Sequence, residues 1–130
     1  PTPEIYPKEA IEAGAFIVAT GRSDYPNQIN NSMAFPGIFR AAVDMNTEKI
    51  NIQMKIAAAE GIAHSIPDED IRVERIVPHS MDTFVAMTVA KSVAKVAQRE
   101  GLIRRPGVSA DSVEENIDAW FHEGELRVKF

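Results

Sequence analysis

The segment AFIVAT at residues 15–20 decides the fold class that this sequence predicts. It is an unbroken apolar run with β-branched residues, and a glycine stands directly before and directly after it. A run of this length is typical of a strand buried on both faces, as in a parallel sheet, because a buried helix needs a longer run. A central strand needs neighbours on both sides. We therefore expect residues 15–20 to pair with the tail ELRVKF, with residues near Pro1 or with another molecule, or else to be disordered.

Helical patterns flank this segment. Residues 7–14 predict a short helix, because a proline suits a first turn and Gly14 suits a stop. The stretch AFPGIFRAAVDM at residues 34–45 predicts a second helix, with Pro36 near its first turn.

Two longer helices follow from capping residues and apolar periodicity. Thr47 is the predicted N-cap of a helix that runs to about residue 66 and that Pro67 stops. Ser80 is the predicted cap of the next helix, which Gly101 ends. The apolar faces of these two helices are Ile50, Met54, Ala57 and Ile62 in the first, and Val85, Val89, Val93 and Val96 in the second.

The last part of the chain predicts a short helix and an extended tail. Ser112 and Glu115 form a capping box, S-x-x-E, that opens the helix. In the tail ELRVKF, residues 125–130, apolar and basic residues alternate, so we expect it to be extended with its apolar side down. Trp120 and Phe121 of the helix are expected either to cover a subunit contact or to be buried within the chain.

Together these elements predict an α/β fold weighted toward helix. We interpret it as the helix-rich C-terminal part of a Rossmann-like doubly wound domain, followed by a helical extension. Residues 1–66 form the predicted first part, with a loop at residues 21–32 beyond the strand, and residues 67–130 form the second. The opening PTPEIYPKEA lacks a methionine and begins with a turn-like Pro-Thr-Pro, so we expect it to be the middle of a longer protein.

Composition excludes several classes of protein. The 130 residues suit one domain, and 45% hydrophobic with 25% charged residues is ordinary for a soluble one. A net charge of −5 argues against a nucleic-acid partner. The absence of cysteine excludes disulfides and thiolate metal sites. No apolar run approaches the ~18–20 residues that cross a bilayer, and nothing resembles a signal peptide, so we expect no membrane contact and a cytoplasmic location.

The loop ATGRSDYPNQINNSMAFPG at residues 19–37 carries the main candidate site residues, Asn30 and Asn31. Ligands of open parallel sheets gather beyond the carboxyl ends of the strands, where this loop begins. Each asparagine amide offers donors and an acceptor without a charge to desolvate. The pair can therefore bind the carboxylate and hydroxyl of a small polar substrate, or a nicotinamide carboxamide. The alternative is that both residues are helix caps and turn formers.

The string NQINNSMAFPGIFRAA, which follows ATGRSDYP and is preceded by PTPEI, resembles the malic enzyme family in its short bacterial and archaeal form. The resemblance runs from Pro1 to about Ala63, weakens to a pattern of helices up to Gly101 and fades beyond it. It implies an enzyme that oxidises malate with NAD or NADP and a divalent metal, Mg or Mn, and decarboxylates the product to pyruvate and CO2.

The resemblance also implies roles for individual residues. Asn30 and Asn31 match the family's asparagine pair, of which at least one contacts the substrate carboxylate. Ala19, Thr20 and Gly21 match the strand end beside the nicotinamide. Residues 1–66 would then be the C-terminal part of the NAD(P)-binding domain.

The family's tyrosine acid, lysine base, metal ligands and glycine-rich phosphate loop lie upstream of the match. We therefore expect a C-terminal piece of a malic enzyme that carries one wall of the active site and is inactive alone. Its expected partners are malate or pyruvate, the remainder of the parent enzyme and further copies of itself, because the family commonly forms oligomers. Two alternatives stay open, a non-catalytic helical interaction domain and a subunit that a second chain completes.

The remaining polar residues favour structural roles. The widely spaced His64, His79 and His122 are expected to be surface or capping residues. The acidic run at residues 68–70 suits a solvated helix start rather than a calcium site.

Three loop and packing residues are also candidates for structural roles. Tyr6 is interpreted as packing and Tyr25 as part of the loop, with a place beside the site. Arg22 is expected to pair with Asp24, and an approach of Arg22 to a cofactor phosphate is the alternative.

Overall fold

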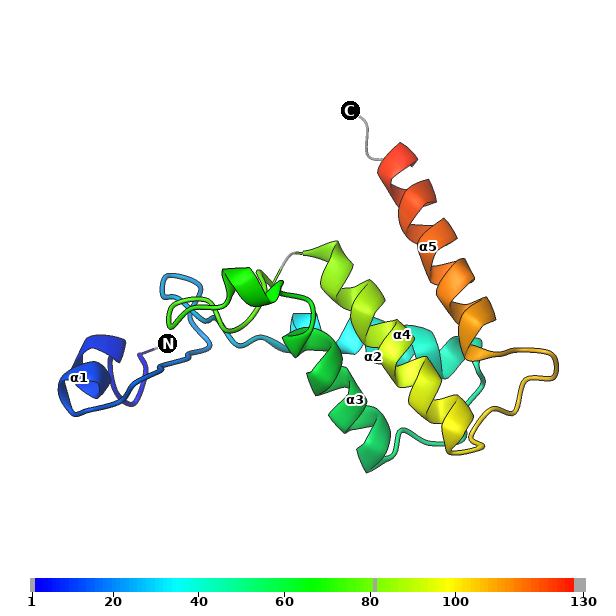
Figure 1. The fold of residues 1–130 in the computed structure, drawn as a ribbon, viewed down its shortest axis with the longest axis horizontal. Helices are drawn as coiled ribbons and strands as arrows, with labels where there is room; N and C mark the ends of the chain where they lie inside the picture. Colours follow the sequence, from blue (N-terminus) through cyan, green and yellow to red (C-terminus); the bar gives the residue numbers. More distant parts are fainter. Residues whose placement is uncertain (1, 81, 128–130) are drawn as a thin grey trace.

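A computed structural model describes residues 2–80 and 82–127, the side chains of residue 83 and of residues 120–127 excepted. Five α-helices are described, with two single-turn 3₁₀ helices between them (Figure 1). In chain order the elements are α1 (Pro7–Glu12), η1 (Asn31–Met33), α2 (Phe35–Asp44), α3 (Ile52–Ala63), η2 (Asp68–Asp70), α4 (Thr83–Arg99) and α5 (Ala110–Arg127).

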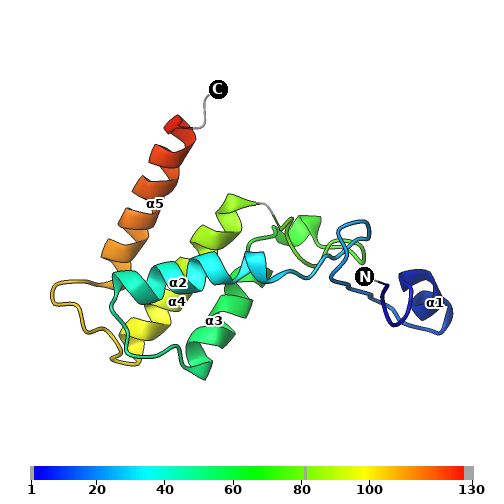
Figure 2. The same ribbon diagram turned by 180° about the vertical axis from the view of Figure 1, so that it is seen from behind.

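The helices α2, α3 and α4 pack together, and the two ends of the chain extend from this group. Figures 1 and 2 show α1 at the end of a long irregular segment on one side and α5 rising from the opposite side. None of the described helices is long and apolar enough to cross a membrane. The predicted weighting toward helix is confirmed.

The predicted strand at residues 15–20 does not form. Among the described residues no strand is present, and Thr20 makes only an isolated parallel bridge with Gln28. Phe16 is 79% exposed and Ile17 is 43% exposed, so the apolar run is not buried. The physical reason is that a strand needs a partner along most of its length, and the described part of the chain supplies one only at Thr20.

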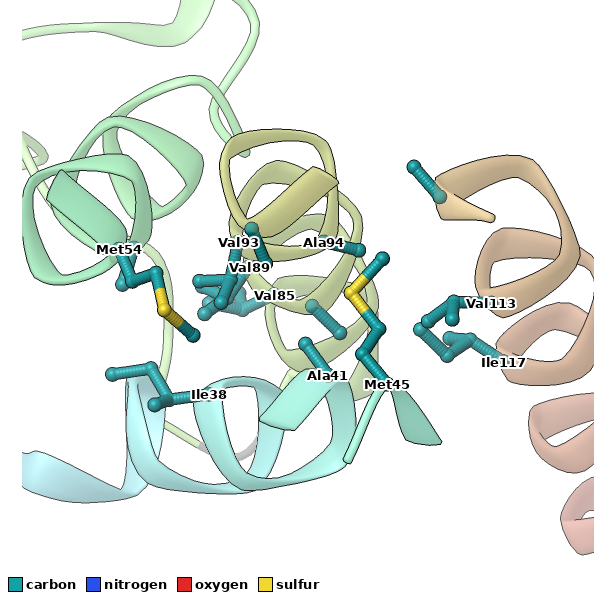
Figure 3. Packing of buried hydrophobic residues seen from close by; sticks show 14 of the residues in the cluster. Ile38, Ala41, Met45, Met54, Val85, Val89, Val93, Ala94, Val113 and Ile117 are labelled. Atoms are coloured by element: carbon teal, nitrogen blue, oxygen red, sulfur yellow. The ribbon is translucent and has the colours of Figure 1, made fainter. Parts of the chain in front are cut away.

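The core surrounds α4, as the valine periodicity predicts. Val85, Val89 and Val93 are at most 1% exposed and lie on one face of the helix. Figure 3 shows these valines near Met54 of α3, and Met45, just after α2, near the α5 residues that pack on this group. Burying each of these larger side chains contributes about 1.5–3 kcal/mol. Residues of α2, α3, α4 and α5 contribute to this one core. The division of the chain into two parts at residue 66 stays a prediction.

Two glycines allow α2 and α3 to approach α4 closely, and both face Val89. A Cβ atom added at Gly37 would lie 2.5 Å from the carbonyl oxygen of Ala86 and 2.7 Å from the Val89 Cβ. A Cβ added at Gly61 would lie 3.0 Å from the Val89 Cα. Real Cβ atoms rarely approach so closely, so only glycine fits at the first position without a shift of backbone.

The start of α2 is confirmed, but α3 begins later than predicted. Pro36 lies in the first turn of α2. Thr47 does not cap α3; Asn51 does, because its Oδ1 accepts a hydrogen bond from the Met54 N–H at 2.9 Å. The intervening Asn46 has φ +50 and turns the chain at the end of α2.

The cap of α4 also differs from the prediction. Asp82 caps the helix through its Oδ1, which accepts from the Phe84 N–H at 3.0 Å, and Ser80 is not the cap. Aspartate is as good a cap as serine, so composition alone does not separate the two positions. At the other end Gly101 has φ +66 and terminates the helix, as predicted.

The final helix is longer than predicted and starts from a different cap. Ser109 Oγ accepts from the Ser112 N–H at 3.2 Å, and Ser112 Oγ accepts from the Ser109 N–H at 2.9 Å. The helix α5 continues to Arg127, so residues 125–127 are helical, which corrects the predicted extended tail. Residues 128–130 and the side chains of Trp120 and Phe121 lie outside the described residues.

An ion-pair cluster joins α5 to α4. Lys91 Nζ lies 3.1 Å from Glu114 Oε1 and 3.0 Å from Asp118 Oδ1. Burial lowers the pKa of Lys91, but the hydrogen bonds to Asp118 and Glu114 outweigh burial and raise the pKa of this amine. The contacts of Val113 and Ile117, both fully buried, complete the docking of the first half of α5.

We expect Gly37→Ala to destabilise the chain. The overpacking cost of about 1–3 kcal/mol exceeds the gain in helix propensity, which is up to about 1 kcal/mol. Gly61→Ala should cost less, since its closest contact is 3.0 Å. Urea unfolding followed by circular dichroism measures both, and Ala59→Gly at an exposed position of α3 reports propensity alone. An unchanged or raised midpoint for Gly37→Ala would contradict the close approach.

We expect Lys91→Met to lower the free energy of unfolding by about 1 kcal/mol at pH 8. The folded pKa of Lys91 is raised, so its stabilising contribution is fully present below the unfolded pKa of about 10.4 and is lost as pH rises through the folded pKa. The difference from wild type should therefore shrink above about pH 10.4.

Lys95→Met is the matched control for this experiment. Lys95 is 63% exposed and lies 3.8 Å from Glu114, so its replacement should change stability much less. A Lys91→Met difference that stayed constant up to pH 12 would show that charge does not hold α5.

Candidate functional site

The segment at residues 18–32 is anchored by one buried asparagine, Asn27. Its side chain is 6% exposed, and its Nδ2 donates to the Val18 carbonyl at 3.0 Å and to the Val73 carbonyl at 2.7 Å. Its Oδ1 accepts from the Ile76 N–H at 2.9 Å. The backbone at Asn27 has φ +55, a conformation that asparagine tolerates better than most residues. Asn27 therefore joins two parts of the chain that are far apart in sequence.

A second set of polar contacts involves Ser80. The Ser80 hydroxyl donates to Gln28 Oε1 at 3.1 Å, and the Ser32 hydroxyl donates to the Ser80 carbonyl at 3.4 Å. The Gln28 Nε2 group donates to the Gly21 carbonyl at 3.4 Å. The segment between α3 and α4 thus contacts the second half of the loop, at Asn27, Gln28 and Ser32.

A cleft of about 540 Å³ lies at the start of this loop. Its volume falls within the roughly 300–1,000 Å³ typical of small-molecule sites. The lining residues are Thr2, Pro3, Glu4, Thr20, Gly21, Arg22, Ser23, Asp24 and Gln28. Two of the three residues expected beside a nicotinamide, Thr20 and Gly21, therefore line one cleft, whereas Ala19 is not among the lining residues.

Backbone hydrogen bonds hold this side of the cleft. The Ile29 N–H donates to the Thr20 carbonyl at 2.8 Å, and the Thr20 N–H donates to the Asn27 carbonyl at 3.3 Å. A Cβ atom added at Gly21 would meet only the Ile29 carbonyl, at 3.9 Å. The glycine thus presents uncovered backbone to the cleft, against which a flat ring can pack.

Arg22 and Asp24 form an ion pair in the cleft wall, as predicted. Arg22 Nε and Nη2 donate to the two carboxylate oxygens of Asp24 at 2.8 and 2.6 Å. The hydrogen bond to Asp24 raises the pKa of Arg22, and the same contact lowers the pKa of Asp24. The guanidinium also lies 5.6 Å from the ring centre of Tyr25, which places that tyrosine beside the site.

Asn30 and Asn31 lie after the cleft and do not line it. Asn30 Oδ1 accepts from the Ser32 N–H at 3.0 Å and caps η1, which agrees with the capping alternative for this residue. The Asn31 side chain is exposed and makes no hydrogen bond within the described part of the chain. Among the described residues, both the donor and the acceptor groups of the Asn31 side chain are therefore without a hydrogen bond, whereas one acceptor site of Asn30 is occupied.

His64 and the acidic residues 68–70 have the structural roles expected of them, whereas Tyr6, which was expected to pack, is 42% exposed and is the N-cap residue of α1. His64 is the C-cap of α3. The acidic residues 68–70 form η2, and Asp70 pairs with Arg75 at 3.0 Å. Among the residues and side chains that the structure describes, no group of three or more His, Cys, Asp or Glu residues could hold a metal ion. The His122 side chain lies outside the described residues.

Sequence reasoning missed Asn27 and the segment around Val73 and Ser80. The only local signal was an asparagine in a turn after Pro26, a pattern that is common in ordinary turns. The partner segment is 46 residues away from Asn27 in sequence, so no local pattern reveals the contact. The stretch at residues 2–4 was noticed for its resemblance, but its place in the cleft comes from the structure.

Comparison with known sequences gives one family and many relatives. The family described as "Malic enzyme, NAD binding domain" matches residues 15–98. The bifunctional malic/malolactic enzyme of Bacillus subtilis is 51% identical over 104 residues, which are 80% of this chain and 25% of that protein. The NAD-dependent malic enzyme of Geobacillus stearothermophilus is 43% identical over 108 residues, 83% of this chain and 22% of that protein. The chain thus spans about a quarter of the length of these relatives.

Solved structures give the same relationship. The malic enzyme of Pyrococcus horikoshii superposes with a TM-score of 0.88 at 45% identity, over 98% of this chain and 29% of that chain. The malic enzyme of Entamoeba histolytica superposes with the same TM-score, 0.88, at 36% identity, over 99% of this chain and 26% of that chain.

Proposed function

Because this chain belongs to the malic enzyme family, with residues 15–98 in the family's NAD-binding domain, we propose that it forms one wall of a malic enzyme active site. The complete enzyme would carry out the NAD- or NADP-dependent oxidation of malate and its decarboxylation to pyruvate and CO2. The observation that carries this proposal is the cleft of about 540 Å³ that Thr20 and Gly21 line. Within the complete protein, these residues would belong to a doubly wound parallel sheet, with residues 15–20 as one of its strands.

The cleft fits the nicotinamide end of the cofactor better than its phosphates. Gly21 leaves room for a flat ring, and the Thr20 hydroxyl offers a donor and an acceptor beside it. Arg22 is already paired with Asp24, which reduces its attraction for a phosphate. When bound, NAD or NADP would supply the hydride acceptor for C2 of malate. The contribution of this chain is to orient the ring through Thr20 and Gly21 and to exclude water from that side of it.

Asn31 is the stronger candidate for the substrate contact. Its exposed amide has no competing hydrogen bond among the described residues, so its Nδ2 is available to donate to a malate carboxylate. Its Oδ1 is available to accept from the malate hydroxyl. The Asn30 Oδ1 already accepts from the Ser32 N–H, so Asn30 would contribute mainly its Nδ2 donors. A divalent metal would be held by residues of the complete enzyme that this chain does not provide.

Exposed apolar residues support association with the remainder of the enzyme or with further copies. Phe35, Phe39 and Val43 stand on one face of α2 and are 51%, 54% and 72% exposed. Phe16, at 79%, adds to the apolar surface before the cleft. Such surface is costly to leave in water. The same observation favours the second candidate, a non-catalytic interaction domain, so an activity test is needed to separate the two.

We expect the isolated chain to show no turnover. The acid, the base and the metal ligands would be supplied by the rest of the enzyme, so one wall alone would not activate malate. The measurement is a steady-state assay with malate, NAD or NADP and Mn²⁺, followed by absorbance of the reduced cofactor. Reduced cofactor that accumulates in proportion to purified chain would contradict this expectation.

We expect Asn31→Ala to weaken malate use in a complete enzyme. Such an enzyme is obtained by placing residues 1–130 in the matching region of the Bacillus subtilis protein. Loss of a hydrogen bond to a charged group is worth about 1.5–3 kcal/mol, so kcat/KM for malate should fall about 10- to 100-fold, mainly through KM. The exposed Asn31 has no structural contact to lose, so thermal unfolding should be unchanged.

Asn30→Ser is the matched control, because serine retains the cap of η1 and removes only the amide donor. A smaller loss of kcat/KM than for Asn31→Ala is expected. Wild-type kinetics for Asn31→Ala and for the double alanine variant of Asn30 and Asn31 would show that neither amide binds malate. A folded complete enzyme without turnover would favour the interaction domain instead.

A further inference from the structure

Asn27 occupies an unusual position for a polar residue of the loop. It is the one polar or charged residue among the buried side chains of the described chain, at 6% exposed. The residues to which its side chain is hydrogen-bonded, Val18, Val73 and Ile76, are not among those of the hydrophobic cluster that joins α2, α3, α4 and α5. The reason for its burial is therefore sought in these hydrogen bonds.

Those hydrogen bonds join the backbone beside Thr20, which lines the cleft, to the segment before α4. The Nδ2 contact to Val18 holds the backbone two residues before Thr20, and the Asn27 carbonyl accepts from the Thr20 N–H at 3.3 Å. Two further contacts, to the Val73 carbonyl and the Ile76 N–H, attach this point to the segment before α4. A buried amide with three satisfied hydrogen bonds is held in one orientation, because breaking any of them leaves an unpaired polar group.

We propose that Asn27 is a positioning residue, which fixes the Thr20–Gly21 wall of the cleft relative to the substrate amide of Asn31. This proposal rests on the proposed function. Asn27 itself touches neither cofactor nor substrate. Backbone hydrogen bonds of Thr20 with Asn27 and Ile29 close the loop, and the Asn27 side chain ties this closure to Val18 and to the segment before α4. Asn31 follows Asn27 by four residues. The Asn27 side chain therefore acts on the position of the Thr20–Gly21 wall, while the packing of Met33 and α2 in the core places Asn31.

Three variants in the complete enzyme test this role. Asn27→Gly keeps the φ +55 conformation without strain and removes all three side-chain hydrogen bonds. We expect kcat to fall about 10- to 100-fold through misplacement, with a smaller change in KM for malate, since the contact groups remain. Asn46→Gly is the matched control, because Asn46 has φ +50 but is exposed, and its kinetics should be those of wild type.

Asn27→Asp adds a pH-dependent rescue that simple loss of packing would not produce. At pH 8 its carboxylate faces the carbonyl oxygens of Val18 and Val73, so kcat should fall as in Asn27→Gly. Burial beside two carbonyls raises the folded pKa above the unfolded value of about 3.9, so protonation at lower pH restores one donor and one acceptor. The ratio of kcat to that of wild type at the same pH should therefore rise toward pH 5 for Asn27→Asp. For Asn27→Gly the ratio should stay constant.

The outcomes are separable. Wild-type kcat in Asn27→Gly, together with impaired Asn31→Ala, would overturn the positioning role and leave the proposed function intact. A constant ratio for Asn27→Asp across pH would also overturn it, because the donor would then be irrelevant. Wild-type kinetics for Asn31→Ala would remove the Asn31 contact and with it the positioning role, while the proposed cofactor wall at Thr20 and Gly21 would remain. Circular dichroism of each variant checks the helical core, which Asn27 does not enter.

Discussion

The contact of two glycines with Val89 determines how the helices of this chain are arranged. Gly37 of α2 and Gly61 of α3 bring two backbones against the same turn of α4, and neither position has room for a normal Cβ contact. Alanines 90, 94 and 97 extend this close packing along the helix. The position of α2 on α4 also sets the position of η1, which ends directly before it. The packing of the core therefore determines where Asn31 stands.

The region of the cleft is held by different forces. The segment at residues 18–32 is attached to the segment before α4 through amide, hydroxyl and backbone groups, with Asn27 and Ser80 as the main contacts. Such contacts depend on direction, whereas apolar contacts depend mainly on area. Directional contacts suit a region in which the two proposed ligand-binding elements must keep a fixed relation. The apolar core stabilises the helices, and the polar contacts hold residues 18–32 in place against the segment before α4.

The sequence predicts those features of the structure that depend on neighbouring residues, and it fails for those that depend on distant parts of the chain. The valine stripe of α4, the proline in the first turn of α2 and the stop at Gly101 depend on neighbouring residues, and all three are confirmed. The cap positions were wrong at α3 and α4, because several good capping residues stand close together. The strand at residues 15–20 was also wrong for the described chain, because strand formation depends on distant partners. At the site, Thr20 and Gly21 were found through resemblance, while Asn27 was missed because its partners lie far along the chain.

The way in which α5 is attached has a mechanical consequence. The helix runs for 18 residues, or about 27 Å at 1.5 Å per residue, yet its described core contacts come from its first half, at Ala110, Val113 and Ile117. Among the described side chains, those that hold α5 to the core belong to its N-terminal half. If the helix tilted by about 10° at that end, its other end would be displaced by roughly 5 Å over such a length. A fluorophore pair attached to α5 and to α3 would register such a tilt.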